Sequence, residues 1–251
     1  MPLLETIGSG GARGYGLFGK ISFNGLTSET AAESAKQIKL DFPSSPSGVY
    51  WIRGSDGVAY QVYCDMTLDG GGWMMILNYV HQSGTNPSLL VRTSSFPLLN
   101  NQYTFADESG STSVGGSWGH ISNSLANSIT WSEYMFYGKS SGHSRVIHFR
   151  GNNSNIVSYI KTGSGSMSPS HRDELTNFSG SLRSNSTLPL HMTTSEGFSN
   201  EGDKAMTEFP MYGDSSIGNP RSHWGIKGQT NRWEVDDAGT NVSTIHRVWA
   251  R

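Results

Sequence analysis

A strand-like hairpin followed by three consecutive glycines limits the fold of this chain more than any other feature. Residues 49–52 and 59–64 are rich in strand formers, and the turn residues 54–57 between them are typical of a hairpin. Gly70–Gly72 then precede an apolar stretch that begins at Trp73. Glycine has no Cβ, so this run lets the backbone turn tightly and lets the indole be buried beside the hairpin.

The rest of the chain reads as an α+β domain. Residues 28–40 are rich in helix formers, with Ser28 as the expected N-cap, so we expect a helix there. Glycine-, serine- and asparagine-rich loops separate the remaining apolar stretches. Further strands are expected at residues 73–77, 134–137, 145–149, 156–160 and 245–249.

The chain divides into two unequal parts. Residues 1–27 are glycine-rich with isolated apolar pairs, and such a segment cannot build a core of its own. We expect it to be an extended attachment arm that orders by docking. Residues 28–251 are expected to form one domain.

The composition favours a globular, loop-rich protein and argues against several partners. Aromatic residues make up 11% and charged residues 15% of the chain, the reverse of a disordered profile. The net charge is −2 and the basic residues are scattered, so nucleic acid is not expected to bind. No apolar run approaches the roughly 20 residues that span a bilayer, and the N-terminus lacks a signal-peptide pattern.

Cys64 is the single cysteine, so an intrachain disulfide is excluded. Loop-rich secreted domains normally carry several disulfides, and we therefore expect a protein made in a reducing compartment. Cys64 alternates with Tyr63 and Asp65 in an expected strand, which favours a buried structural thiol over a nucleophile.

The stretches 46–52, 60–66 and 69–76 together resemble the opening of fibrinogen C-terminal-like domains, a family that includes ficolins and the related intelectin-type lectins. The resemblance implies a loop-rich fold around a central, mostly antiparallel sheet with short helices. Ala35 stands where that family has a cysteine, so the usual partner of Cys64 is missing. Residues 247–251 are similar to the final strand of the family, which returns to the central sheet.

The first 20 residues resemble segments in structural proteins of tailed phages from aquatic bacteria. This resemblance implies a virion fibre, spike or decoration protein that is made in the host cytoplasm. Residues 1–25 would attach it to other virion proteins, and the head would bind a host-surface glycan or protein. Homo-oligomeric display would raise a weak single-site affinity.

The loop region 195–237 contains the candidate site, since fibrinogen-like lectins bind ligand in their C-terminal part. Flat rings and hydrogen-bonding tips suit a sugar, and hard oxygen donors suit calcium. The expected ligand-binding residues are Tyr212, Asn219, His223, Trp224 and Trp233, and the expected calcium ligands are Glu201, Asp203 and Asp214. The alternative is that these acids are solvated and the tryptophans belong to the core.

No acid–base or nucleophile constellation emerges, so we do not expect an enzyme. Residues 142–144 resemble a nucleophile elbow but lack its second glycine. Two alternatives to a virion adhesin stay open: a purely structural capsid or tail decoration protein, and a secreted lectin of innate immunity.

Overall fold

The computed structural model describes most of the chain up to residue 163 and parts of the remainder. The described residues are 22–85, 87–99, 104–142, 144, 146–163, 176–177, 224–228, 232–235 and 242–251. The helices in these ranges are short, and none combines the length and the apolar character that a membrane crossing requires.

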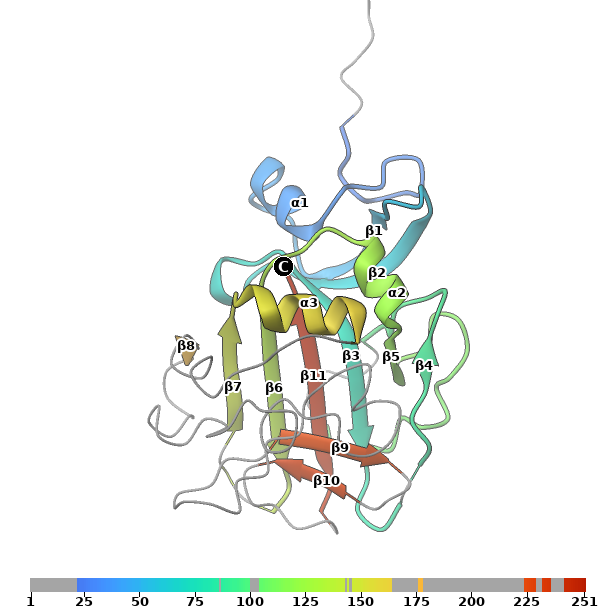
Figure 1. Ribbon diagram of the computed structural model, residues 1–251, viewed down its shortest axis with the longest axis vertical. Coiled ribbons are helices and arrows are strands. Elements are labelled where there is room, and N and C mark those ends of the chain that lie inside the picture. Colours follow the sequence, from blue (N-terminus) through green and yellow to red (C-terminus); the bar gives the residue numbers. More distant parts are fainter. Residues whose placement is uncertain are drawn as a thin grey trace, which may run out of the picture.

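A nine-stranded sheet dominates the described part of the chain (Figure 1). Its main path runs β1-β2-β3-β11-β6-β7-β8, and β4 and β5 extend it beside β3. The strands are β1 (Gly48–Arg53), β2 (Ala59–Asp65), β3 (Trp73–His81), β4 (Val91–Arg92), β5 (Gly119–Ile121), β6 (Tyr134–Ser140), β7 (Val146–Gly151), β8 (Thr176–Asn177) and β11 (Thr244–Ala250). A separate hairpin pairs β9 (Trp224–Gly228) with β10 (Arg232–Val235).

The strand pairing confirms the expected α+β class with a mostly antiparallel central sheet. Only the β4–β5 pair is parallel among the described strands. The C-terminal strand β11 lies between β3 and β6 and pairs with both. It thus joins strands that lie far apart in the sequence. The hairpin of β1 and β2 is present in the predicted place, with Val49 opposite Tyr63.

The triple glycine behaves as the sequence predicts. Gly70, Gly71 and Gly72 all have φ between 77° and 83°, in the left-handed region. A Cβ on Gly71 would lie 2.3 Å from the carbonyl oxygen of Met66. Trp73 follows with a fully buried ring whose Nε1 donates to the Leu68 oxygen at 3.1 Å. The 3₁₀ turn η1 (Leu68–Gly70) is thereby pinned against the start of β3.

The prediction of a helix over residues 28–40 is wrong for its first half. Helix α1 spans Ala35–Asp41, and Ser34 is its N-cap, accepting from the amide of Gln37 at 3.1 Å. Ala32 instead continues the sheet edge, since its amide donates to Trp51 and its oxygen accepts from Arg53. Pairing with β1 therefore competes with the local helix preference and prevails.

The strand expected at residues 156–160 is a helix. Helix α3 spans Ser154–Thr162, and the side chain of Asn153 caps its first turn. Ile156, Tyr159 and Ile160 are its buried residues, at the three- and four-residue spacing of a helical face. Over so short a stretch, the apolar residues fit both the two-residue period of a strand and the 3.6-residue period of a helix. The second helix, α2 (Asn123–Ser128), packs against α3.

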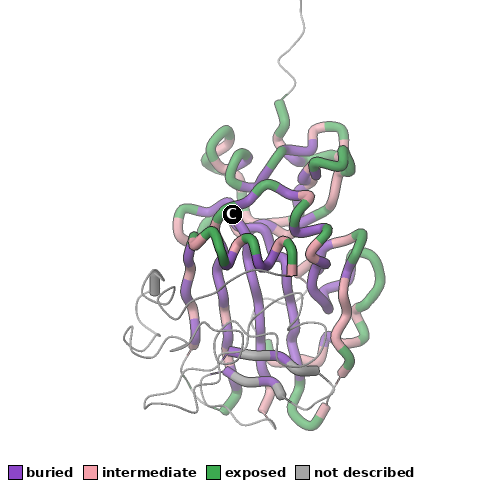
Figure 2. The backbone as a smooth tube through the Cα atoms, viewed as in Figure 1, coloured by how far each residue is buried: buried purple, intermediate pink, exposed green. Residues whose placement is uncertain are grey.

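The two faces of the sheet differ. Helix α3 and the β9–β10 hairpin lie across one face, where the larger buried core lies (Figures 1 and 2). On the opposite face a smaller buried cluster contains Trp73, Met75, Met135 and Trp249. Partly buried Tyr63, Leu68 and Leu99 pack against this cluster.

Candidate functional site

Six of the eight residues singled out in the loop region lie outside the described residues. These are Glu201, Asp203, Tyr212, Asp214, Asn219 and His223. Calcium binding by the three acids therefore stays a prediction. Within the described ranges, no group of three or more histidine, cysteine or acidic side chains is arranged to hold a metal ion.

The two tryptophans singled out with them are described, and both are core residues. Trp224 is 1% exposed, and its Nε1 donates to the Tyr137 oxygen at 2.9 Å. Trp233 is fully buried and stacks on His81, with ring centroids 4.3 Å apart and an interplanar angle of 5°. Protein side chains cover these rings, so the expected sugar-stacking role of Trp224 and Trp233 does not fit this structure.

A cavity of about 710 Å³ lies instead on the face opposite α3, between the η1 turn and strands β6 and β7. We call it the β6–β7 pocket. The strand register explains its floor, because Tyr137 on β6 lies opposite His148 on β7, and Lys139 lies opposite Val146. The remaining lining residues, on and before η1, are Asp65, Thr67, Leu68 and Asp69.

The Asp65 carboxylate shapes one wall of the pocket. Its Oδ1 accepts from the amides of Thr67 and Leu68 at 2.8 and 2.9 Å and from the Thr67 hydroxyl at 2.9 Å. Such a side-chain-to-backbone turn fixes the chain direction directly after β2. The wall is therefore organised before any ligand arrives.

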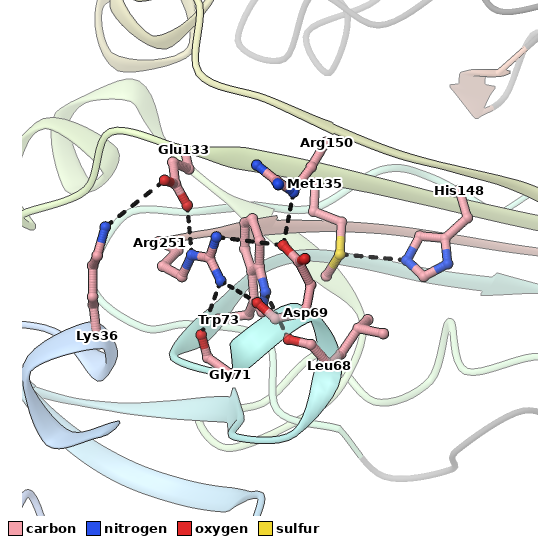
Figure 3. Close-up of polar contacts among 10 residues, drawn as sticks. All are labelled: Lys36, Leu68, Asp69, Gly71, Trp73, Glu133, Met135, His148, Arg150 and Arg251. Carbon is pink, nitrogen blue, oxygen red and sulfur yellow. Dashed lines mark hydrogen bonds and ion pairs between the residues drawn. The ribbon is translucent and has the colours of Figure 1, made fainter. Parts of the chain in front are cut away.

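Asp69 adopts a strained conformation that ion pairs and hydrogen bonds hold in place. Its φ of 44° is the one positive value among described non-glycine residues. Its Oδ2 lies 2.7 Å from Nε of Arg150, close enough for an ion pair, and 3.4 Å from Nη2 of Arg251 (Figure 3). Arg251 also donates from Nη1 to the main-chain oxygen of Asp69 at 2.6 Å. Both arginines thus stabilise the η1 turn.

The side chain of Arg251 ties this turn to the rest of the domain. Its guanidinium lies over the Trp73 ring and pairs with the Glu133 carboxylate, which also lies 3.7 Å from Nζ of Lys36 on α1 (Figure 3). One cation thus connects the end of β11 with η1 and with the residue before β6. These contacts of Arg251 therefore hold the η1 wall of the pocket in place.

Tyr137 and His148 form the aromatic floor. Their rings meet edge to face at 5.3 Å, and His148 Nε2 lies 3.3 Å from the sulfur of Met135. Burial lowers the pKa of His148 to about 4, outweighing the opposite pull of Asp65 and Asp69. The imidazole is therefore neutral at physiological pH. The side chain of His148 is half-buried in the pocket.

Among the described residues that line the pocket, Lys139 is the positively charged one. Its Nζ lies 5.3 Å from the centroid of the Phe105 ring, a cation–π distance. Sequence reasoning missed Tyr137 and Lys139 as site residues. Tyr137 and Lys139 alternate with buried Phe136 and Gly138, which indicates that they share the other face of the strand. The alternation does not indicate which residues pack on that face.

Cys64 is fully buried, as expected from its strand position. Its thiol donates to the Val62 oxygen at 3.6 Å, and burial raises its pKa. A nucleophilic role would require an accessible thiolate. Cys64 is a packing residue on the face that carries the larger core.

No protein-family model matches the chain. Among solved structures, the fold is similar to the fibrinogen-like globe domain of human ANGPTL6, with a TM-score of 0.43 and 13% sequence identity over 90% of this chain and 98% of that one. It is also similar to the fibrinogen-like globe domain of human ANGPTL2, with a TM-score of 0.35 and 11% identity over 86% of this chain and 97% of that one. These similarities concern chain arrangement alone, and no functional residue is carried over from them.

Proposed function

We propose that this protein is a non-catalytic recognition domain that binds a saccharide in the β6–β7 pocket. The observation that carries the proposal is the combination of an aromatic pair, Tyr137 and His148, with the Lys139 ammonium around one cavity. Its volume of about 710 Å³ lies within the usual range for small-molecule sites.

The pocket chemistry suits a sugar ring. The C–H face of a sugar packs on aromatic carbons, while its hydroxyls donate to carboxylates and accept from ammonium groups. Tyr137 offers a ring face or edge and Lys139 offers three donors. Thr67 also lines the cavity. Binding rather than bond cleavage is favoured because Asp65 and Asp69 already hold the η1 turn.

The setting we propose is a virion surface. The resemblance of the first 20 residues to phage structural proteins and the single buried cysteine support it. Residues 1–25 would join the head to other virion proteins, and several heads on one particle would give avidity for host-surface glycan. A structural decoration protein and a secreted lectin are the competing functions.

The binding proposal is tested by measuring how the full chain binds to a glycan array and to a panel of microbial cells. Each measurement is made with calcium and then with a chelator. Selective binding is expected, and Lys139→Gln should weaken it at least about tenfold, the equivalent of 1.4 kcal/mol. Lys39→Gln on α1 removes the same charge away from the pocket and should leave binding unchanged. A folded wild-type chain that binds neither glycans nor cells would favour the decoration function.

The virion setting needs a separate test. An antibody raised against the full chain should label virus-sized particles from the source of the gene in immunogold electron microscopy. Labelling confined to soluble secreted material would instead support the secreted lectin.

A further inference from the structure

A groove of about 600 Å³ lies beside helix α1, and its lining includes Phe23, Glu33, Asp41 and Phe42. We call it the α1 groove. Helix α1 and strand β1 lie at the end of the molecule where the described chain begins (Figure 1). The groove has no lining residue in common with the β6–β7 pocket, so it is a separate surface.

Two carboxylates give the α1 groove an acidic character. Glu33 directly precedes the N-cap of α1, and Asp41 is the last residue of the helix. Gln37, one turn before Asp41, donates from Nε2 to Oδ2 of that carboxylate at 2.8 Å. No ion pair joins Glu33 or Asp41 to another described residue. Arg53 also lines the groove, but its guanidinium donates to two main-chain oxygens. The groove therefore suits a cationic partner.

Aromatic rings form the apolar part of the α1 groove. Phe23 is 50% exposed although it is a large apolar side chain. Phe42, the C-cap residue of α1, is partly buried and packs against the larger core. An occupant that covers the Phe23 ring would remove apolar surface from water, which is favourable. The groove thus combines acidic groups with an apolar floor.

The N-terminal arm joins the domain at this groove. Ser22 is the first described residue, and it lines the groove. Main-chain hydrogen bonds fix the chain directly after it, since Gly25 donates to the Thr30 oxygen at 2.8 Å and accepts from the Trp51 amide at 2.7 Å. The arm of each chain therefore begins beside the groove of that chain.

The sequence of the arm has chemistry that complements the groove. Residues 12–20 contain two cations, Arg13 and Lys20, and no acidic residue. Between the cations lie the apolar side chains of Tyr15, Leu17 and Phe18. Opposite charges on two surfaces orient them and exclude wrong partners. The glycines between these residues allow the backbone to approach a surface closely.

We propose that the α1 groove of one copy binds residues 12–20 of a second copy of this chain. Because each arm begins beside a groove, two copies related by a two-fold axis can exchange arms, and the same contact then occurs twice. Nine extended residues span at most about 30 Å, which is enough to reach across such an interface. The proposal is independent of the saccharide site and makes another copy of the chain one partner of the arm.

The test is sedimentation equilibrium of the full chain at low salt. The wild type should dimerise reversibly, and salt should weaken the dimer because charge pairs at a surface are screened. Arg13→Glu/Lys20→Glu reverses the charge of the arm, and Glu33→Lys/Asp41→Lys reverses that of the groove. Either double variant alone should raise the dissociation constant at least about tenfold.

An equimolar mixture of the two double variants should dimerise again. In the mixed dimer the reversed arm meets the reversed groove, and the wild-type arm meets the wild-type groove. Restoration also shows that both variants are folded. Glu29→Lys is the control, because this exposed acid lies near Glu33 in sequence but does not line the groove, and it should leave the dimer unchanged.

Three results would overturn the proposal. A wild-type chain that stays monomeric, as it would if each arm bound the groove of its own chain, excludes exchange between copies. A dimer that neither double variant weakens would have a different interface. Two weakened variants whose mixture does not dimerise would show that the arm does not bind in the α1 groove.

Discussion

The guanidinium carbon of Arg251 lies 4.1 Å from the centroid of the Trp73 ring. The same side chain donates to the main-chain oxygens of Asp69 and Gly71, at 2.6 and 3.2 Å. The end of β11 therefore holds the glycine turn from which β3 begins. Since η1 forms a wall of the β6–β7 pocket, this contact links the stability of the domain to the shape of the candidate site.

Replacement of Arg251 should destabilise the domain. Arg251→Ala removes the cation over Trp73 and leaves Asp69 and Glu133 without this partner, so we expect a loss of about 2–4 kcal/mol. Urea unfolding of the full chain measures it. Lys36→Ala removes an exposed partner of the same Glu133, and its cost should stay within about 1 kcal/mol. Equal costs for the two variants would contradict the anchoring role.

Gly71 and Gly57 form a matched pair for testing the glycine turn. Both have positive φ, 77° and 81°, so alanine is strained at either position. Gly71 also has a ψ of −170°, a combination that is essentially restricted to glycine. A Cβ at Gly57 meets nothing within 4 Å, whereas one at Gly71 lies 2.3 Å from the Met66 oxygen. Gly57→Ala should cost about 1–2 kcal/mol.

Gly71→Ala should cost at least about 1–3 kcal/mol more than Gly57→Ala, because the backbone must shift as well. Thermal and urea unfolding give both values. Indistinguishable variants would mean that the close approach at Met66 is not a constraint.

Acidification should weaken the fold through His148. Its pKa is lowered to about 4 in the folded protein, so between the ordinary value of 6.5 and about 4 the unfolded chain binds more protons. Stability is therefore fully present above pH 6.5 and declines as the pH falls towards 4. The lowered pKa of His81, also caused by burial, acts in the same direction.

His148→Gln should remove part of this decline. Urea midpoints at pH 7.5, 5.5 and 4.5 for the wild type and the variant measure the difference. A wild-type protein that becomes more stable over this acid range would refute the assignment of a neutral, buried imidazole.

Cys64 should be inert in the native state. Burial raises its pKa and keeps the thiol protonated, so a disulfide reagent such as dithiodipyridine can react only after opening of the core. We expect native modification to be at least about 10³-fold slower than modification in denaturant. Fast reaction of the folded chain would place the thiol at the surface.

The sequence predicted the local elements well where one pattern dominated. The hairpin, the glycine turn before Trp73 and the burial of Cys64 each depend on residues within a few positions of one another. The helix start moved from Ser28 to Ser34 because β1 binds Ala32, a contact that no local pattern contains. Likewise, the short apolar stretch at residues 156–160 fits the period of a strand as well as that of a helix. Helix α3 forms there, and the side chain of Asn153 caps it.

The candidate site could not be predicted from local sequence patterns. Trp224 and Trp233 looked suited to a sugar, yet they fill the core between the β9–β10 hairpin and the sheet. A side chain's exposure depends on what packs on it, and that partner comes from distant sequence.

The sequence by itself determined the α+β class, the hairpin and the turn that leads into β3, because steric and hydrogen-bonding preferences act over a few residues. Only the tertiary structure decided that β11 enters between β3 and β6 and that Tyr137 faces His148 beside the Asp65 turn. Those contacts join residues far apart in the chain. They arise from sheet register and from the burial of both faces, which no short stretch of sequence encodes.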